Sequence, residues 1–432
     1  SAFDSTSAEK RVCDLFDIAT LEAFGSFTRA EVSAMGAVIE YLTITQRGKL
    51  PLLRPPQKEA EARTVQIDAA TRRNLELTHS LNGGRAGSLL SIMDNTVTAG
   101  GARLLERRIS SPSRVVDVVT SRADAVSFAY DNARVAEDIR QRLRNVPDLD
   151  RALSRLSLDR GGPRDLAAIR NGLIEAEALH QSLTQQDLPD LLREAAEGLQ
   201  GHGDLIDLLD HALVAEPPLM VRDGGFIAPG HDADLDAARE LRDEGRSVIA
   251  GMQQQFVSDT GISSLKIKHN NVLGYFVECT ATHVRFTTVE LSELETKILN
   301  AGNHAQEIEK RLYESLRSAI LEHAAEIGQA SAGLAEVDLA TGLADLARSE
   351  NWTRPRVDMS RAFDIQGGRH PVVERALTQQ SGEPFIANDC DLSAEGEAAN
   401  IWLLTGPNMA GKSTFLRQNA LIALMAQMGS FV

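Results

Sequence analysis

The feature that most constrains the fold is a long stretch of helical hydrophobic spacing at Val289–Ser349. Apolar residues recur three or four positions apart along it: Leu291, Leu294, Ile298, Ile308, Leu312, Ile320, Leu334, Val337 and Leu346. As one helix it would span about 90 Å at ~1.5 Å per residue. Its glycines, Gly302, Gly328 and Gly333, are candidate positions for a bend or a break. A compact domain has no use for such a helix, so the sequence predicts an extended, mainly helical protein.

A small β element interrupts the helical spacing just before this stretch. Asp232–Val257 has its apolar residues on one helix stripe, and Ser263–Thr280 then alternates apolar and polar residues with period two. The turn between the two alternating segments is Asn270–Gly274. We therefore expect two antiparallel helices, out and back, that carry a β hairpin at their far end.

The expected β tip is locally basic in an acidic chain. The net charge of −16 argues against a uniformly basic nucleic-acid binder but leaves room for a local patch. Residues 262–286 hold three basic side chains against Glu278, a net of +2, together with His269 and His283. Charge alone favours equally a contact with phosphate backbone and an ordinary exposed hairpin edge blunted by lysine. The candidate DNA-contacting residues are Lys266, Lys268, Asn270, Asn271 and Arg285.

A second group of basic residues lies in the helical region at 85–215. It comprises Arg103, Arg107, Arg108, Arg140, Arg142 and Arg144. Because Asp and Glu are interleaved with them, a solvated helix face is favoured over a DNA-binding patch.

The chain also contains a phosphate-binding motif, G-P-N-M-A-G-K-S-T at 406–414. The apolar run Ile401–Leu404 before it predicts a buried parallel strand, and helical spacing follows it to Met428. This arrangement points backbone N–H groups and a helix N-terminus at a phosphate. Lys412 would reach the terminal phosphates, and the Ser413 hydroxyl would bind Mg²⁺. We expect ATP or ADP with Mg²⁺ as the ligands.

Residues 351–432 accordingly read as the opening of an α/β nucleotide-binding domain, with further strands at Ala362–Ile365 and Phe385–Ala387. Hydrolysis in this class also needs an acidic residue on a later strand, and nothing after Met428 can supply it. We expect a piece of an ATPase with the phosphate cradle present, without the complete hydrolytic machinery and with negligible hydrolysis.

The cysteines, the apolar runs and the N-terminal segment exclude several kinds of protein. Cys13, Cys279 and Cys390 are scattered, without the spacing of a metal site or a disulfide framework. No apolar run approaches ~18 residues, and the polar Ser1–Lys10 is no signal peptide. These features predict a cytosolic protein without a membrane span.

Seven segments resemble, in family order, the MutS family of bacterial DNA mismatch-recognition proteins. They are Asp68–Leu77, Asn95–Leu105, Val221–Ala228, Ser264–Val277, Gly368–Glu374, Pro384–Asn388 and Thr405–Gln418. The last of them, T-G-P-N-M-A-G-K-S-T-F-L-R-Q, is far more specific than a generic phosphate loop.

The resemblance implies a multidomain, mainly α-helical fold in which a long helical lever carries a small β clamp, followed by the start of an α/β P-loop domain of the ABC type. The implied map is 1–63 core start with a possible connector remnant, 64–258 core and lever, 259–297 clamp, 298–350 returning lever helix, and 351–432 truncated ATPase domain.

Function and site residues follow from the same resemblance. The family acts as a dimer that encircles double-stranded DNA, with clamps on the backbone and ATP altering the grip, and with a downstream repair factor of the MutL type. It implies a cytoplasmic, nucleoid-associated bacterial protein. Phe385 and Ile386 would line the adenine pocket. The phosphates and Mg²⁺ would be held within the loop of Gly406, Pro407, Asn408, Met409, Ala410, Gly411, Lys412, Ser413 and Thr414, chiefly by Asn408, Gly411, Lys412, Ser413 and Thr414.

The chain also departs from the family pattern. The family's N-terminal mismatch-reading domain with its Phe-x-Glu wedge is missing, and we interpret Phe276-Val277-Glu278 as a coincidental match. The segment after Thr280 is shorter than the family's clamp tip. A DNA-organising or recombination clamp that never reads mismatches therefore stays open beside a fragment of a mismatch-repair ATPase. A third alternative is an unrelated cytosolic ATPase with a helical insertion.

Overall fold

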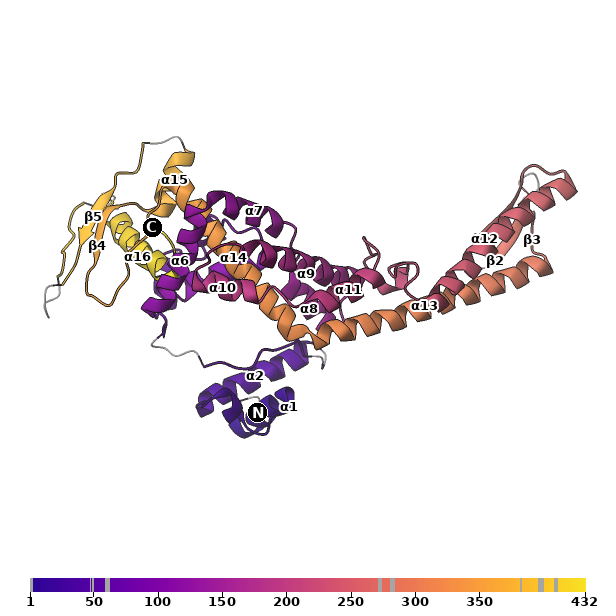
Figure 1. Ribbon diagram of the computed structural model, residues 1–432, viewed down its shortest axis with the longest axis horizontal. Coiled ribbons are helices and arrows are strands. Elements are labelled where there is room, and N and C mark those ends of the chain that lie inside the picture. The colour runs from indigo at the N-terminus through magenta and orange to yellow at the C-terminus, as the bar shows by residue number, and fades with distance from the viewer. Residues whose placement is uncertain are drawn as a thin grey trace. The chain divides into compact units, whose positions relative to one another are not determined.

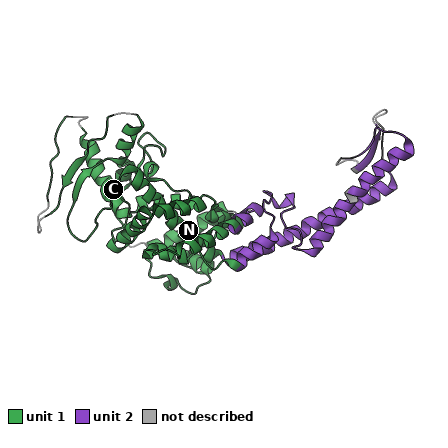
Figure 2. Cartoon of the chain, turned by 45° about the horizontal axis from the view of Figure 1, so that its top comes forward, with its two compact units in different colours: residues 1–158, 171–203, 324–432 green, residues 159–170, 204–323 purple. Residues whose placement is uncertain are grey.

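The computed structural model describes residues 3–46, 48, 50–58, 63–270, 274–279, 284–380, 383–394, 400–407 and 411–432 (Figure 1). The chain forms two compact units, coloured separately in Figure 2. Unit 1 comprises Ser1–Leu158, Asn171–Gly203 and Ala324–Val432, and unit 2 comprises Asp159–Arg170 and Asp204–His323. Helices predominate, and the described strands form two small antiparallel sheets.

The N-terminal part of unit 1 is a small helical layer. It contains α1 (Ser5–Phe16), a 3₁₀ turn (Leu21–Phe24) and α2 (Arg29–Thr45). Thr28 and Glu31 form a reciprocal capping box at the start of α2. A Cβ on Gly36 would lie only 2.2 Å from the Cβ of Ala8, so the closest approach of α1 and α2 requires glycine.

The centre of unit 1 is α14 (Ala324–Glu350), which is buried on nearly all sides. The helices packed against it are α5 (Ala99–Ser110), α6 (Val116–Asp131), α7 (Ala133–Leu143), α8 (Leu149–Ser157) and α10 (Asp190–Glu197). Two shorter helices, α3 (Ala69–Asn74) and α4 (Leu89–Met93), precede them. Further along the chain, α9 (Pro163–Leu183) begins at a proline, which suits the first position of a helix, and α11 (Gly203–Ala212) follows α10.

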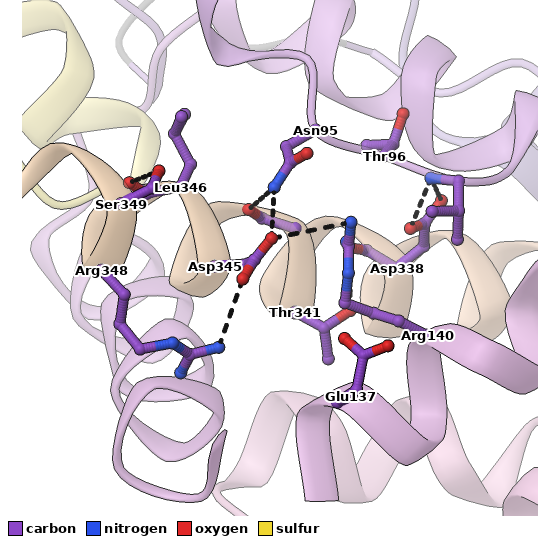
Figure 3. A network of polar contacts seen from close by, with 12 residues as sticks. Asn95, Thr96, Glu137, Arg140, Asp338, Thr341, Asp345, Leu346, Arg348 and Ser349 are labelled. Atoms are coloured by element: carbon purple, nitrogen blue, oxygen red, sulfur yellow. Dashed lines mark hydrogen bonds and ion pairs between the residues drawn. The ribbon is translucent and has the colours of Figure 1, made fainter. Parts of the chain in front are cut away.

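A buried polar network fixes the start of α5 on α14 (Figure 3). Asp338 is fully buried and accepts hydrogen bonds from the backbone N–H of Val97 at 3.0 Å and of Thr98 at 2.8 Å. Burial raises the pKa of Asp338, while the bonds from Thr98 and Val97 act in the opposite direction. Asn95 donates to Asp345 at 2.9 Å and to the Gly342 carbonyl at 3.3 Å. The segment 95–98, part of one family-like motif, is thereby held by α14.

Five of the six arginines in the group at 103–144 form ion pairs with acids, but the group does not form a single solvated face. Arg103 contacts Asp148 at 2.9 Å on the surface. Arg108 and Arg140 are buried instead, which corrects the prediction for these two. Arg108 lies 2.5 Å from Glu336 of α14, so its charge is balanced inside the unit rather than offered to a ligand.

Unit 2 contains two long helices, α12 (Ala233–Thr260) and α13 (Val289–Glu322), which lie side by side in Figures 1 and 2. The strands β1 (Leu265–Asn270), β2 (Gly274–Cys279) and β3 (Val284–Phe286) connect them as one antiparallel sheet. The predicted hairpin and the helix before it are confirmed. Thirty-four residues make α13 about 51 Å long at ~1.5 Å each.

The expectation of one helix over Val289–Ser349 is wrong. The helix ends at Glu322, His323 is its C-cap, and α14 starts at Ala324. None of the three glycines interrupts either helix. The hydrophobic spacing continues through the break and so does not reveal it. α13 buries one face in unit 2, whereas α14 is surrounded in unit 1, so the position of the break follows from packing rather than from a glycine or proline.

A short turn that precedes α12 in the chain is hydrogen-bonded to α13. A 3₁₀ turn at Val221–Asp223 leads into Gly224 and Gly225. The buried carboxylate of Glu309 accepts from the Gly225 N–H at 2.8 Å and from Arg239 at 2.5 Å. The family-like segment Val221–Ala228 is thus tied to both long helices.

The C-terminal part of unit 1 contains β4 (Asp364–Gly368), α15 (Pro371–Gln379), β5 (Asn388–Asp391) and α16 (Lys412–Met428). β4 and β5 pair antiparallel. The far end of α16 packs through Leu421, Met425 and Met428 into the core shared with α5 and α6. This anchors the helix that follows the phosphate-loop motif.

Three strand predictions in unit 1 need correction. Ala362–Ile365 overlaps β4 only at its end, and Phe385–Ala387 precedes β5 without joining it. Ile401–Leu404 pairs with no described strand, and its first and third side chains are 88% and 89% exposed. The predicted opening of a parallel α/β sheet is therefore not seen in the described residues. The prediction rested on local sequence, which does not reveal whether a buried strand has neighbouring strands to pair with.

Among the described residues, no helix is both long and apolar enough to cross a bilayer.

Candidate functional site

A pocket of about 800 Å³ lies at the phosphate-loop motif, within unit 1. Two segments far apart in sequence meet in its wall. Phe385 and Ile386 come from the connection before β5, whereas Gly406, Pro407, Gly411, Lys412 and Thr414 come from the loop and the start of α16. The tertiary structure therefore brings together the two sets of residues that the sequence assigned to one ligand.

Some predicted site residues are not placed in this wall. Asn408, Met409 and Ala410 lie outside the described residues. Ser413 is the second residue of α16 and is exposed, and it does not line the pocket. The structure thus gives the predicted magnesium ligand a position beside the pocket rather than in it.

The loop ends in a backbone geometry suited to an anion. Gly411 has φ +83°, a left-handed conformation that favours glycine, and α16 begins at the next residue. Among the described residues no side chain caps this helix start, and its first turn carries no acidic residue. The first N–H groups of α16 and the positive end of its dipole are therefore free to receive a negative group.

Lys412 folds back over the loop. Its ammonium donates to the carbonyl oxygen of Gly406 and, at 2.5 Å, to that of Pro407. The cation thus lies at the mouth of the loop, bonded to two neutral acceptors. A phosphate oxygen would be a stronger acceptor for the same donor, because its negative charge attracts the ammonium more strongly than a neutral carbonyl does.

Three further wall residues were not singled out as ligands from the sequence. Trp402 and Phe415 stack with ring planes 2° apart and centroids separated by 6.5 Å. Gln418 is fully buried, and neither amide atom has a hydrogen-bond partner among the described residues. The signal that could have found two of them is their spacing, because Lys412, Phe415 and Gln418 follow each other at three-residue intervals along one side of α16.

α15 contributes another part of the wall through Val373 and Leu377. Its N-cap is His370, whose ring nitrogen accepts from the Val373 N–H at 3.4 Å. Burial, with the positive charge of Arg417 second, lowers the pKa of His370 to about 4. The ring is therefore neutral near pH 7 and able to accept the capping bond.

The β tip of unit 2 is the second candidate site. Leu265 and Val277 face the two helices and pack with Ile249, Leu291 and Ile298 in one buried cluster. On the opposite face of β1, Lys266 and Lys268 are exposed. This sheet has one apolar face on its helical support and one face that carries lysine.

The charge of this face is smaller than the sequence count suggested. Lys268 forms an ion pair with the buried carboxylate of Glu278, whereas Lys266 has no ion pair with any described residue. Phe276 is buried as well as Glu278, so neither side chain of the Phe-x-Glu triplet projects into solvent. Asn271 lies outside the described residues, as do the side chains of Asn270 and Arg285; the backbone of Arg285 pairs opposite Glu278 in β3.

Comparison with known proteins identifies two family models along the chain. The model described as MutS domain III matches residues 70–344, and the model described as MutS domain V matches residues 402–432. Similar curated proteins include the DNA mismatch repair protein MutS of Roseobacter denitrificans, 66% identical over the whole chain, and those of Ruegeria sp. and Ruegeria pomeroyi, both 65% identical.

The coverage of these relatives is partial. The chain spans about half their length, 52% in each of the three. The alignments extend over 454 residues, against 432 in this chain, so the relatives contain residues that it lacks. That these residues fall after Thr280, in the tip, stays a prediction.

Proposed function

Because the chain belongs to the MutS family, as the match of the domain III model over residues 70–344 shows, we propose that it is part of a DNA mismatch repair ATPase. In this proposal unit 1 binds ATP at the phosphate-loop pocket, and unit 2 contacts the backbone of duplex DNA through its β tip. The similar proteins are DNA mismatch repair proteins, which favours mismatch repair over a clamp that only organises DNA.

One observation carries the nucleotide part of the proposal. Phe385 and Ile386 share a pocket with Lys412 and the start of α16, although more than twenty residues separate the two segments. The pocket combines an apolar wall for a base with a cation and free N–H groups for phosphates. In the proposed complex, Lys412 exchanges its two loop carbonyls for phosphate oxygens.

Magnesium would be held beside the phosphates by the Ser413 hydroxyl, which lies in the first turn of α16. The ion would neutralise phosphate charge. The chain's own contribution is to place the hydroxyl next to Lys412 and to direct the helix N-terminus at the same anion.

Two observations favour the DNA part of the proposal: the sheet of unit 2 packs firmly on its two helices, and Lys266 and Lys268 are exposed. Lysine on a strand face can bind phosphates without reading bases. Arg285, Asn270 and Asn271 remain candidate contacts. Coupling of ATP to the grip on DNA, a homodimer that encircles the duplex, a MutL-type partner and a place in the bacterial cytoplasm near the nucleoid belong to the proposal for the whole protein.

Titration with a fluorescent ATP analogue and Mg²⁺ tests the nucleotide site. We expect Lys412→Ala to weaken binding at least about 10-fold, because a charge-assisted bond to phosphate is lost. Lys310→Ala, which removes an exposed lysine of α13, is the matched control and should bind as the unaltered chain does. Equal affinity of the Lys412→Ala variant and the control would contradict the proposed site.

A further inference from the structure

An ion pair joins the helix that follows the phosphate loop to the family-like segment Asp68–Leu77. The guanidinium of Arg417 in α16 donates through Nη1 to Oε2 of Glu76 at 3.2 Å, although 341 residues separate the two positions. The other carboxylate oxygen, Oε1, accepts from the backbone N–H of Leu81 at 2.7 Å. The carboxylate is thus held from both sides, and Arg417 bonds to an acceptor that is fixed by the surrounding chain.

The backbone of Glu76 has an unusual conformation. Its φ is +52°, in the left-handed region, which glutamate adopts rarely and which favours glycine or asparagine. Backbone bonds maintain it: the Glu76 N–H donates to the Arg73 carbonyl at 3.1 Å, and the Glu76 carbonyl accepts from the Leu89 N–H at 2.9 Å. Unfavourable conformations that are held in this way cluster at functional positions. Since the backbone alone favours glycine, the contribution of glutamate here lies in its side chain.

Arg417 lies on a different side of α16 from the residues that line the pocket. It follows Lys412 by five residues, which is about 140° around the helix at ~3.6 residues per turn, and it is not part of the pocket wall. The far half of α16 is buried through Leu421 and Met425, whereas residues 412–417 are exposed or partly exposed. The ion pair therefore supplies a polar anchor near the phosphate end of the helix, where burial supplies little.

The charges of this pair also reach the second helix of the pocket wall. His370 is the N-cap of α15, and its pKa is lowered first by burial and then by the positive charge of Arg417, while Glu76 acts in the opposite direction. Val373 and Leu377 of the same helix line the pocket. The pair is thus close to the start of α15 as well as to the first turns of α16.

We propose that Glu76 is a positioning residue for the phosphates of the bound nucleotide. The proposal rests on the proposed nucleotide site. Glu76 fixes Arg417, and through it the first turns of α16, in the orientation that directs Lys412 and the N–H groups at the helix start towards the pocket. Glu76 does not line the pocket itself. Without the pair, the phosphate end of α16 has more freedom, and nucleotide binding has to restrict it, which lowers the affinity.

A double-mutant cycle, with titration of a fluorescent ATP analogue and Mg²⁺, tests this role. Glu76→Gln keeps an acceptor for the Leu81 N–H but removes the charge, and it should weaken binding about 3- to 5-fold, as expected for loss of a partly exposed ion pair. In the Arg417→Gln background the same change should have an effect of less than about 2-fold, because Glu76 acts through Arg417.

Glu76→Gly separates positioning from a general structural role. Glycine suits the left-handed φ, so the urea midpoint should stay the same or rise, while the affinity for the ATP analogue falls about 3- to 5-fold. Loss of affinity only in proportion to a lower urea midpoint would assign Glu76 a structural role and overturn the proposal.

The matched control is Asp124→Asn. Asp124 forms an ion pair with Arg354 at 2.6 Å, which also joins distant segments of unit 1, but neither residue lines the phosphate-loop pocket. This variant should bind the ATP analogue within about 2-fold of the unaltered chain.

The outcomes separate the two proposals. Equal weakening by Glu76→Gln in both backgrounds, or unchanged affinity of Glu76→Gln while Lys412→Ala still weakens binding, overturns the role of Glu76 and leaves the nucleotide site intact. Unchanged binding on Lys412→Ala, or no nucleotide binding at all, overturns the nucleotide site and the role of Glu76 with it.

Discussion

The tip of unit 2 and the phosphate-loop region of unit 1 differ in how their apolar strand patterns are realised. In the tip, Leu265 and Val277 are 2% and 0% exposed, and β1 and β2 pair in a continuous register. In the phosphate-loop region, Ile401 and Leu403 are 88% and 89% exposed, and residues 401–404 form no strand. The tip alternates apolar and polar residues whereas 401–404 is a continuous apolar run, and both patterns predicted a strand.

The difference teaches that strand formation depends on where the partner surface comes from. The tip sheet is made by consecutive strands, and the helices that cover it, α12 and α13, are its immediate neighbours in the chain. A strand at 401–404 would need partners from elsewhere in the fold, and the nearest described sheet, β4–β5, does not extend to it. Short-range sheets are therefore more predictable than long-range ones.

The largest expected effect concerns burial. Leu291→Ala in the tip cluster removes a fully buried side chain and should lower the free energy of unfolding of unit 2 by about 2–5 kcal/mol. Leu403→Ala makes the same chemical change at an exposed position and should alter stability by no more than about 0.5 kcal/mol. Urea unfolding of both variants measures the contrast. Similar losses would mean that residues 401–404 are buried in solution, and the comparison would fail.

A second effect concerns pH and is confined to the phosphate-loop region. His370 has its pKa lowered from the usual 6.5 to about 4, so between these values the unfolded chain binds more protons than the folded one. The contribution of His370 to the free energy of unfolding should therefore be fully present above pH 6.5, and it should be lost as the pH drops from 6.5 towards 4. Urea midpoints across this range measure the loss.

The matched variant for this effect is His370→Asn, which retains a side-chain acceptor at the N-cap of α15 but does not titrate. It should flatten the dependence of the urea midpoint on pH in this window. An unaltered slope would show that other groups cause it and that His370 is not buried in the neutral form.

The smallest expected effect is electrostatic and belongs to the tip. Glu278→Gln leaves Lys268 without its ion-pair partner and should raise the affinity for duplex DNA. If Lys268 then neutralises one phosphate, the slope of log K against log salt should steepen by about 0.9. Binding to a linear duplex at several salt concentrations measures both. Glu240→Gln, on exposed α12, is the charge-matched control, and equal changes in the two variants would assign the effect to net charge alone.

Much of the site was predictable because its parts are local. The motif at 406–414 specifies a glycine-ended loop before a helix, and the structure has Gly411 in a left-handed conformation with α16 starting at Lys412. The pairing of this loop with Phe385 and Ile386 followed only from family resemblance. Gln418 ends the family-like segment Thr405–Gln418, but the sequence did not predict its burial or its lack of hydrogen-bond partners among the described residues, because spacing does not reveal either property.

The sequence by itself determined the helical character of the chain, the β hairpin between two long helices, the helix that starts after Gly411 and membership of a family. Each of these depends on spacing and backbone preferences over a few neighbouring residues. Only the tertiary structure decided the helix break at His323, the burial of Arg108 and Arg140, the exposure of 401–404 and the enclosure of Gln418. Those properties depend on which distant surfaces pack together, because burial and hydrogen-bond partners are supplied by segments far away in the chain.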